Sequence, residues 1–114
     1  MPFIDLRTTA KIDENKEAIL RKEFGKIITL IPGKTEAWLM LEFSDECKMA
    51  FRGNTDGDTA MVSVELLGSA PKKSYDDMTR VICETVNTVL GVPMERIYVK
   101  YEEFSVWGFA GENF

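Results

Sequence analysis

Four short segments of the chain have the residue pattern of β-strands. In the first segment Ile4, Leu6 and Thr8 fall on one face, and the residues between them fall on the other. Pro2 can open this strand, because the first residue of a strand need not donate a hydrogen bond to its neighbour. Runs rich in apolar, β-branched and aromatic residues predict three further strands, at residues 36–43, 59–67 and 96–102.

Two longer segments repeat their apolar residues at the spacing of a helix. The first follows Asp13, which can serve as the N-cap, and ends near Ile31. The second follows Ser74, with Asp77 in the capping-box position, and ends before Gly91. Each helix therefore lies between two of the predicted strands.

The order strand, helix, strand occurs twice, which predicts two right-handed βαβ units. We expect an α/β (α+β) fold in which both units form one four-stranded mixed sheet, with two helices on one face. A chain of 114 residues is long enough for one domain, spanning residues 1–114. A short strand at residues 48–51 would lie between the halves, and the aromatic, turn-rich tail at 105–114 would be ordered.

The strand at 36–43 predicts that the protein associates with itself. Alternate residues from Ala37 to Phe43 are apolar, and so are Trp38 and Met40 on the opposite face. Two helices cover only one face of a four-stranded sheet, so the other face would expose apolar side chains. Another copy of the chain is the expected cover.

The composition excludes several classes of function. The net charge is −5 and no dense basic patch is present, which argues against a nucleic-acid partner. The chain has no histidine, which removes Ser–His and Cys–His pairs and imidazole metal ligands. Cys47 and Cys83 are too far apart for a CxxC redox pair. Acid–base chemistry must therefore use carboxylates, lysine, tyrosine or the chain terminus.

We also expect no metal, cofactor or membrane interaction. The segment 54–58 contains Asn, Asp and Gly, but strands rather than helices flank it, so a turn explains it better than a calcium loop. No apolar run approaches the ~20 residues of a membrane span, and the start of the chain lacks the features of a signal peptide. These observations predict a cytoplasmic protein.

Pro2 is a candidate base as well as a strand opener. Initiator methionine is normally removed before a small residue, which would leave a free secondary amine on Pro2. An exposed α-amino group has a pKa of ~7.7–8.0, and burial or a nearby cation lowers it. An amine at the start of a buried strand could then act as an unprotonated general base at neutral pH.

The order of several short motifs resembles the macrophage migration inhibitory factor family of the tautomerase superfamily. These motifs are Met1-Pro2 at the start of a strand, Gly33-Lys34, residues 49–51 (MAF) and residues 96–99 (RIYV). The resemblance covers the chain from end to end. It implies a homotrimer with sheets around a central barrel, and active sites between subunits that need no cofactor. The implied reaction is keto–enol tautomerisation of a 2-oxo acid such as phenylpyruvate.

The resemblance also implies roles for individual residues. Pro2 matches the catalytic base, and Lys34 matches a lysine that contacts the substrate carboxylate. Leu67 stands where a backbone N–H faces the substrate, and Tyr98 matches a tyrosine from the adjacent subunit. The alternatives are a helix-end cation for Lys34 and a core aromatic for Tyr98. The aromatic end of the pocket is assigned to the tail residues Val106, Trp107 and Phe114.

Two departures from the family pattern affect what can be carried over. Lys100 stands where the best-known member has a pocket asparagine, which adds a cation and could change substrate preference. Thr59 and Val62 replace a CxxC pair, so thiol–disulfide activity is not expected. Two other functions remain open: a cytokine-like ligand with a vestigial pocket, released without a signal peptide and with an unknown receptor, or a superfamily hydratase, dehalogenase or decarboxylase. Members with the second function usually place arginines in the pocket; Arg7, Arg52 and Lys100 are conceivable counterparts, and none of the three clearly matches.

Overall fold

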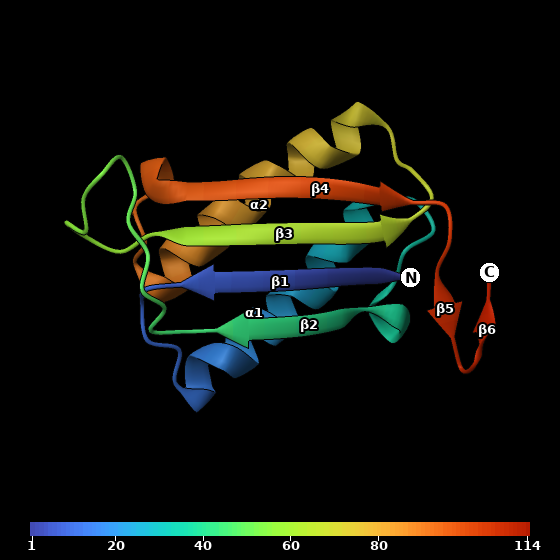
Figure 1. The fold of residues 1–114 in the computed structure, drawn as a ribbon, viewed down its shortest axis with the longest axis horizontal. Coiled ribbons are helices and arrows are strands. Elements are labelled where there is room, and N and C mark those ends of the chain that lie inside the picture. The colour runs from blue at the N-terminus through green and yellow to red at the C-terminus, as the bar shows by residue number, and fades with distance from the viewer.

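A four-stranded mixed sheet forms one layer of the molecule, as seen in a computed structural model that describes residues 1–114 (Figure 1). Its strands are β1 (Pro2–Thr8), β2 (Met40–Ser44), β3 (Ala60–Leu67) and β4 (Ile97–Phe104), in the spatial order β2-β1-β3-β4. The pairs β1–β2 and β3–β4 are parallel, and the central pair β1–β3 is antiparallel. The predicted mixed sheet of two βαβ units is therefore confirmed.

Two helices cover one face of this sheet (Figure 1). Helix α1 (Glu14–Ile27) begins at the predicted cap, where the Asp13 carboxylate accepts a hydrogen bond of 2.8 Å from the Lys16 N–H. It continues as a short 3-10 helix, η1 (Ile28–Leu30), close to the predicted end. Helix α2 (Lys72–Leu90) ends at Gly91, whose positive φ of 74° suits a residue without Cβ. Side chains from both helices and from alternate strand residues form a single buried core.

The second strand begins later than predicted. Residues Glu36–Trp38 form a 3-10 helix, η2, in which the Leu39 N–H bonds the Glu36 carbonyl oxygen at 3.1 Å. The only sheet neighbour of β2 is β1, and their register begins at the pair Phe3–Met40. Because only Met1 and Pro2 precede Phe3 in the chain, β1 offers almost no strand with which the segment before Met40 could pair.

Three other local predictions are wrong. Helix α2 starts at Lys72 with Pro71 as N-cap, so Ser74 lies inside the helix and no side chain caps it. Asp77 does not close a capping box, because its carboxylate pairs with Lys73 at 2.7 Å. Residues 48–51 form no strand: only an isolated bridge joins Phe51 to Asn54. Arg96 belongs to a 3-10 helix, η3 (Met94–Arg96), rather than to β4.

The sheet face opposite the helices, here called the outer face, is uncovered. It carries the strand residues Phe3, Asp5, Arg7, Met40, Glu42, Met61, Ser63, Glu65, Tyr98, Lys100 and Glu102. Met40 and Tyr98 are exposed, at 68% and 58% of their accessible surface. Apolar and charged side chains alternate across this face, so it is less uniformly apolar than the pattern of β2 predicts.

The tail folds back into a small hairpin. Strands β5 (Gly108–Phe109) and β6 (Glu112–Asn113) are antiparallel and form a separate sheet. A hydrogen bond of 2.9 Å from the Phe114 N–H to the Trp107 carbonyl oxygen closes the hairpin. It lies beside the end of the main sheet where β1 starts (Figure 1). The prediction that the tail is ordered is therefore confirmed.

Candidate active site

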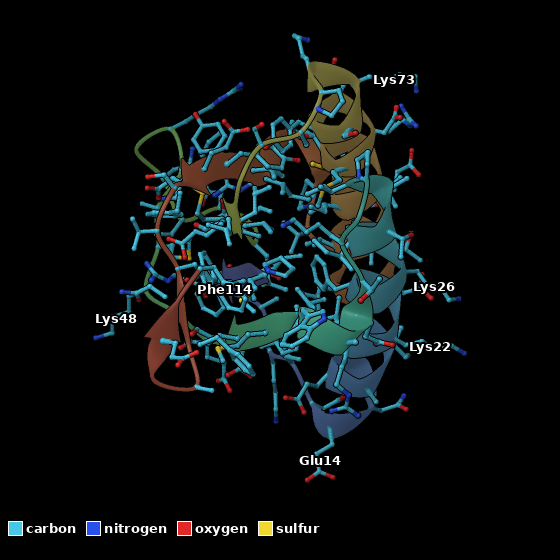
Figure 2. The ribbon with its side chains drawn as sticks, turned by 90° about the vertical axis from the view of Figure 1, so that its right-hand side faces the viewer. Glu14, Lys22, Lys26, Lys48, Lys73 and Phe114 are labelled. Carbon is cyan, nitrogen blue, oxygen red and sulfur yellow. The ribbon has the colours of Figure 1, made fainter.

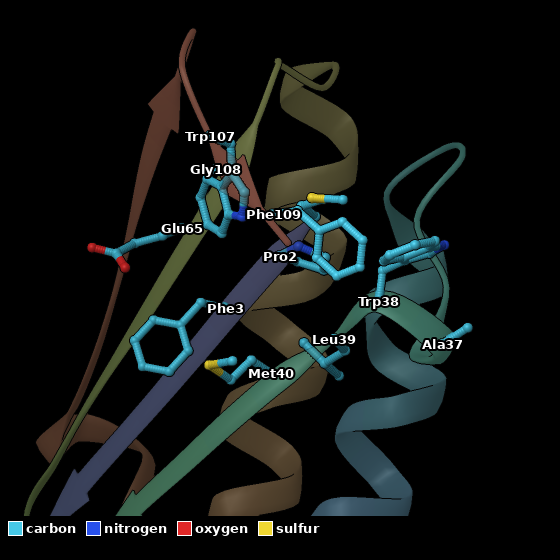
Figure 3. Close-up of a pocket in the computed structure, with 11 residues that line it drawn as sticks. Pro2, Phe3, Ala37, Trp38, Leu39, Met40, Glu65, Trp107, Gly108 and Phe109 are labelled. Carbon is cyan, nitrogen blue, oxygen red and sulfur yellow. The ribbon is translucent and has the colours of Figure 1, made fainter. Parts of the chain in front are cut away.

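A cavity of about 640 Å³ lies at the start of β1, between the main sheet and the terminal hairpin. Residues of η2 and of the terminal hairpin line its sides, and the first residues of β1 and β2 line its base (Figure 3). The residues that line it are Met1, Pro2, Phe3, Ala37, Trp38, Leu39, Met40, Glu65, Trp107, Gly108 and Phe109. Most are apolar, as expected for a pocket that excludes water from a small ligand.

The start of the chain, Lys34 and the end of β3 are joined by hydrogen bonds. The Leu67 N–H donates to the Met1 carbonyl oxygen at 3.1 Å. Lys34 Nζ donates to the Leu67 carbonyl oxygen at 2.9 Å. Lys34 therefore reaches across to β3, which favours a role at this site over a role at the end of α1.

This environment changes the acidity of the chain terminus. Burial lowers the pKa of the Met1 amine from 8.0 to about 6, with further lowering by a hydrogen bond from Lys34 and by its positive charge. An amine at this position is thus mostly unprotonated at neutral pH. Pro2, the next residue, is buried. The Lys34 ammonium group, the Leu67 N–H that the Met1 carbonyl oxygen occupies, and the basic nitrogen of the terminus therefore lie together at the start of β1.

Aromatic rings form part of the cavity wall (Figure 3). The Trp38 ring meets the Phe109 ring edge-on, with centroids 5.1 Å apart and planes at 82°. Phe109 in turn contacts Phe114, at 6.2 Å between centroids. Of the predicted tail residues, Trp107 lines the cavity and Phe114 supports its wall, whereas Val106 is 65% exposed and does not line it.

The turn that carries Trp38 makes a close side-chain contact with α1. The Glu36 side chain lies over Gly25, so that a Cβ on residue 25 would come within 3.2 Å of Glu36 Cγ and closer still to its carboxylate. Gly25 costs helix propensity but leaves room for the Glu36 side chain of this turn. No local pattern in the sequence indicates this contact, and the predicted strand position of Trp38 is wrong.

Tyr98 and Lys100 do not reach the cavity of their own chain. Tyr98 pairs with Met61 at one end of β3, and Pro2 pairs with Leu66 near the other (Figure 1). At ~3.3 Å per residue these positions are about 16 Å apart. The Tyr98 ring is exposed and contacts Phe51 edge-on, with centroids 5.1 Å apart. It is therefore not a core aromatic, and any role at a cavity requires another copy of the chain.

No group of three or more His, Cys, Asp or Glu side chains lies close enough to hold a metal ion. The residues 54–58 form a turn in which the Asn54 side chain accepts a hydrogen bond from the Asp56 N–H at 3.0 Å.

Cys47 and Cys83 are both free, and burial raises the pKa of the Cys83 thiol. None of the helices is long and apolar enough to cross a membrane.

Comparisons with known proteins agree with this geometry. The family model for macrophage migration inhibitory factor (MIF) matches residues 1–114. The crystal structure of Leishmania major MIF2 is 34% identical, with a TM-score of 0.92 over 100% of this chain and 97% of that one. A MIF homologue from Prochlorococcus marinus is 25% identical, with a TM-score of 0.88 over 98% of both chains.

A third structure shares the fold alone. It is Pt0534 inactivated by 2-oxo-3-pentynoate, which is 15% identical with a TM-score of 0.83 over 96% of this chain and 92% of that one. No curated protein matches the sequence.

Proposed function

The chain belongs to the macrophage migration inhibitory factor family, and we propose that it is a keto–enol tautomerase of 2-oxo acids such as phenylpyruvate. In this proposal Met1 is removed and the secondary amine of Pro2 is the general base. Lys34 and the Leu67 N–H bind the oxygen atoms of the substrate. The family includes tautomerases, and the arrangement around the start of β1 supports this activity over the alternatives.

The placement of Met1 is the observation that carries the proposal. Its amine lies beside Lys34, and its carbonyl oxygen accepts a hydrogen bond of 3.1 Å from the Leu67 N–H. Removing Met1 would free this N–H and turn the Pro2 amide nitrogen into a basic amine. An oxygen atom of a 2-oxo acid could then take the position of the Met1 carbonyl. The main chain of Met1 thus occupies the space and the donor that a substrate needs.

The chemistry follows from these groups. The Pro2 amine takes a proton from the carbon next to the keto group, and the C–H electron pair becomes the C=C bond of the enol. The carbonyl π pair moves to oxygen, and the Pro2 ammonium group gives its proton to this oxygen, which completes the enol and restores the free amine. Lys34 holds the carboxylate by charge and keeps the amine unprotonated. The apolar wall around Trp38 excludes water and fits an aromatic side chain.

We further infer that the active form is a homotrimer in which Tyr98 and Lys100 enter the cavity of an adjacent subunit. Their distance from Pro2 in one chain and the uncovered outer face support this arrangement. Light scattering should give three times the chain mass of 12.9 kDa. A monomer would remove both residues from the site.

The deciding experiment compares two forms of the protein that differ only at the start. The first form begins at Pro2. The second form carries an added residue that blocks the removal of Met1. Intact mass confirms the N-terminus of each form. The form beginning at Pro2 should convert phenylpyruvate to its enol, read by absorbance, and the blocked form should be inactive but equally folded. 2-Oxo-3-pentynoate, the inactivator of Pt0534, should add once to the free amine and not to the blocked form. Equal activity of the two forms would exclude Pro2 as the base.

A further inference from the structure

The four strands carry only two cationic side chains, Arg7 and Lys100, and both lie on the outer face. Arg7 is paired, because its Nε lies 3.1 Å from the Asp5 carboxylate. Lys100 is exposed and forms no ion pair, and the residue opposite it on β3 is Ser63. Lys100 is therefore the one unpaired cation on the strands.

Lys100 shares its environment with Tyr98. Alternate residues of a strand point to the same face, so the two side chains stand side by side, about 7 Å apart along β4. Strand β4 is an edge of the sheet. A neighbouring subunit that receives Tyr98 therefore receives Lys100 as well.

No lysine or arginine side chain of the same chain lines the cavity, and Lys34 lies beside the Met1 terminus, against the Leu67 carbonyl oxygen. The only charged side chain in the lining is Glu65, whose carboxylate points away from Pro2 and Trp38 (Figure 3). Beyond that, the carboxylates on the outer face are Asp5, Glu42 and Glu102. None of them lies within 4.0 Å of the Lys100 ammonium group, so Lys100 is free to bind a ligand anion.

A second cation also lies near Tyr98. The Phe51 ring that contacts Tyr98 has the Arg52 guanidinium carbon 5.4 Å from its centroid, and Arg52 forms no ion pair. Arg96 lies 5.5 Å from the same centroid, but it is held by the Asp58 carbonyl oxygen at 3.0 Å. Arg52 is thus a second cation near Tyr98 that forms no ion pair within its own chain.

We propose that Lys100 of the adjacent subunit binds a second anionic group at the far end of the substrate, so that the preferred substrates are aromatic 2-oxo acids with a distal carboxylate. This inference rests on the proposed function and its trimer. Lys34 holds the carboxylate next to the keto group, the aromatic wall holds the ring, and Lys100 holds the distal carboxylate. An apolar pocket without this cation would reject such a group, because a desolvated carboxylate needs a partner.

The test compares phenylpyruvate with 4-carboxyphenylpyruvate, using kcat/KM of the protein that begins at Pro2. Lys100→Met should lower the ratio of the carboxylated to the plain substrate by about tenfold to a hundredfold, as expected for a charge-assisted hydrogen bond. Lys100→Arg, which keeps the charge, should retain most of the ratio. The loss should appear chiefly in KM, since Lys100 lies away from the atoms that react.

Lys22→Met is the matched control, since it removes the same charge from the helix side of the molecule, where Lys22 points away from the sheet (Figure 2). It should leave the ratio unchanged. The inference would be overturned if the ratio of kcat/KM for 4-carboxyphenylpyruvate to that for phenylpyruvate in Lys100→Met lay within twofold of the same ratio in Lys22→Met.

The unmodified protein gives an independent check if Lys100→Met does not assemble. In this protein the ratio of kcat/KM for the carboxylated to the plain substrate should exceed one at low salt and fall as salt screens the charge. A ratio below one at low salt would also overturn the inference. If the unmodified protein converts neither substrate, the proposed function fails. If it converts phenylpyruvate without a preference for the distal carboxylate, only the role of Lys100 fails.

Discussion

Replacing Lys34 with methionine should separate two effects that the proposed mechanism assigns to one ammonium group. Methionine keeps most of the length of the side chain but has no charge and cannot donate a hydrogen bond. Lys34 Nζ donates to the Leu67 carbonyl oxygen at 2.9 Å and also hydrogen-bonds to the terminal amine. The substitution should therefore weaken the binding of the substrate carboxylate and make the amine more basic.

The expected sizes follow from the contacts. A hydrogen bond to a charged group contributes about 1.5–3 kcal/mol, which corresponds to roughly one to two decades in KM. Burial is the main cause of the low pKa of the terminal amine, with Lys34 second. In the form that begins at Pro2 the same two causes should act on the Pro2 amine, so its pKa should rise when Lys34 is removed. A base acts when it is unprotonated, so kcat/KM should reach its plateau at a higher pH.

The assay is the pH dependence of kcat and KM for phenylpyruvate, measured on the form that begins at Pro2. Lys34→Arg keeps the charge and serves as the control, so its pH profile should stay near that of the unmodified protein. An unchanged KM together with an unchanged pH profile in Lys34→Met would refute both roles. A raised KM with an unshifted pH profile would support the role of Lys34 in substrate binding and refute its effect on the pKa of the amine.

Three further substitutions test the surroundings of the site. Gly25→Ala should stabilise the protein by ~0.5–1 kcal/mol in urea unfolding, because alanine favours the helix and the exposed Glu36 side chain can move aside. A loss of stability would mean that Glu36 is fixed there. Trp38→Ala should raise KM about two- to tenfold for phenylpyruvate and less for pyruvate, since an aromatic pair contributes ~0.5–1.5 kcal/mol. Equal effects on both would refute ring recognition. Burial and Glu103 raise the pKa of Tyr75 to about 12. Because the folded form holds this proton more tightly, stability should fall as pH rises from 10 toward 12, and Tyr75→Phe should remove an absorbance transition near pH 12. A transition unchanged in the variant would belong to another tyrosine.

The fold was largely predictable because its elements are coded by local periodicity. The alternation in β1 and β3 and the apolar stripes of α1 and α2 fall on the core face that each pattern predicts. The errors lie where an element depends on a distant partner. The start of β2 is set by the register with β1, and the start of α2 is set by Pro71, not by the Ser74 capping pattern.

The candidate site was predictable only in part, for the same reason. Pro2, Lys34 and Leu67 lie on segments with recognisable motifs, and they meet in the structure. Trp38 and Phe109 were not predicted as partners, because their contact requires both a 3-10 turn after α1 and a hairpin that folds back from the far end of the chain. Residues 71 positions apart share no local pattern that could indicate such a contact.

The outer face shows what a single chain leaves incomplete. Asp5 is only 6% exposed, yet just one of its carboxylate oxygens faces Arg7, and Oδ1 has no hydrogen-bond partner. On the same face Glu65 lies directly opposite Glu102, a like-charge pair that destabilises a sheet. Exposed Met40 adds an apolar surface that water solvates poorly. Other copies of the chain could bring partners to this face. A hydrogen-bond donor would satisfy the Asp5 oxygen, a cation would relieve the repulsion between Glu65 and Glu102, and an apolar side chain would cover Met40. In the proposed trimer these groups would gain partners at the same interface that brings Tyr98 and Lys100 to the cavity of the adjacent subunit.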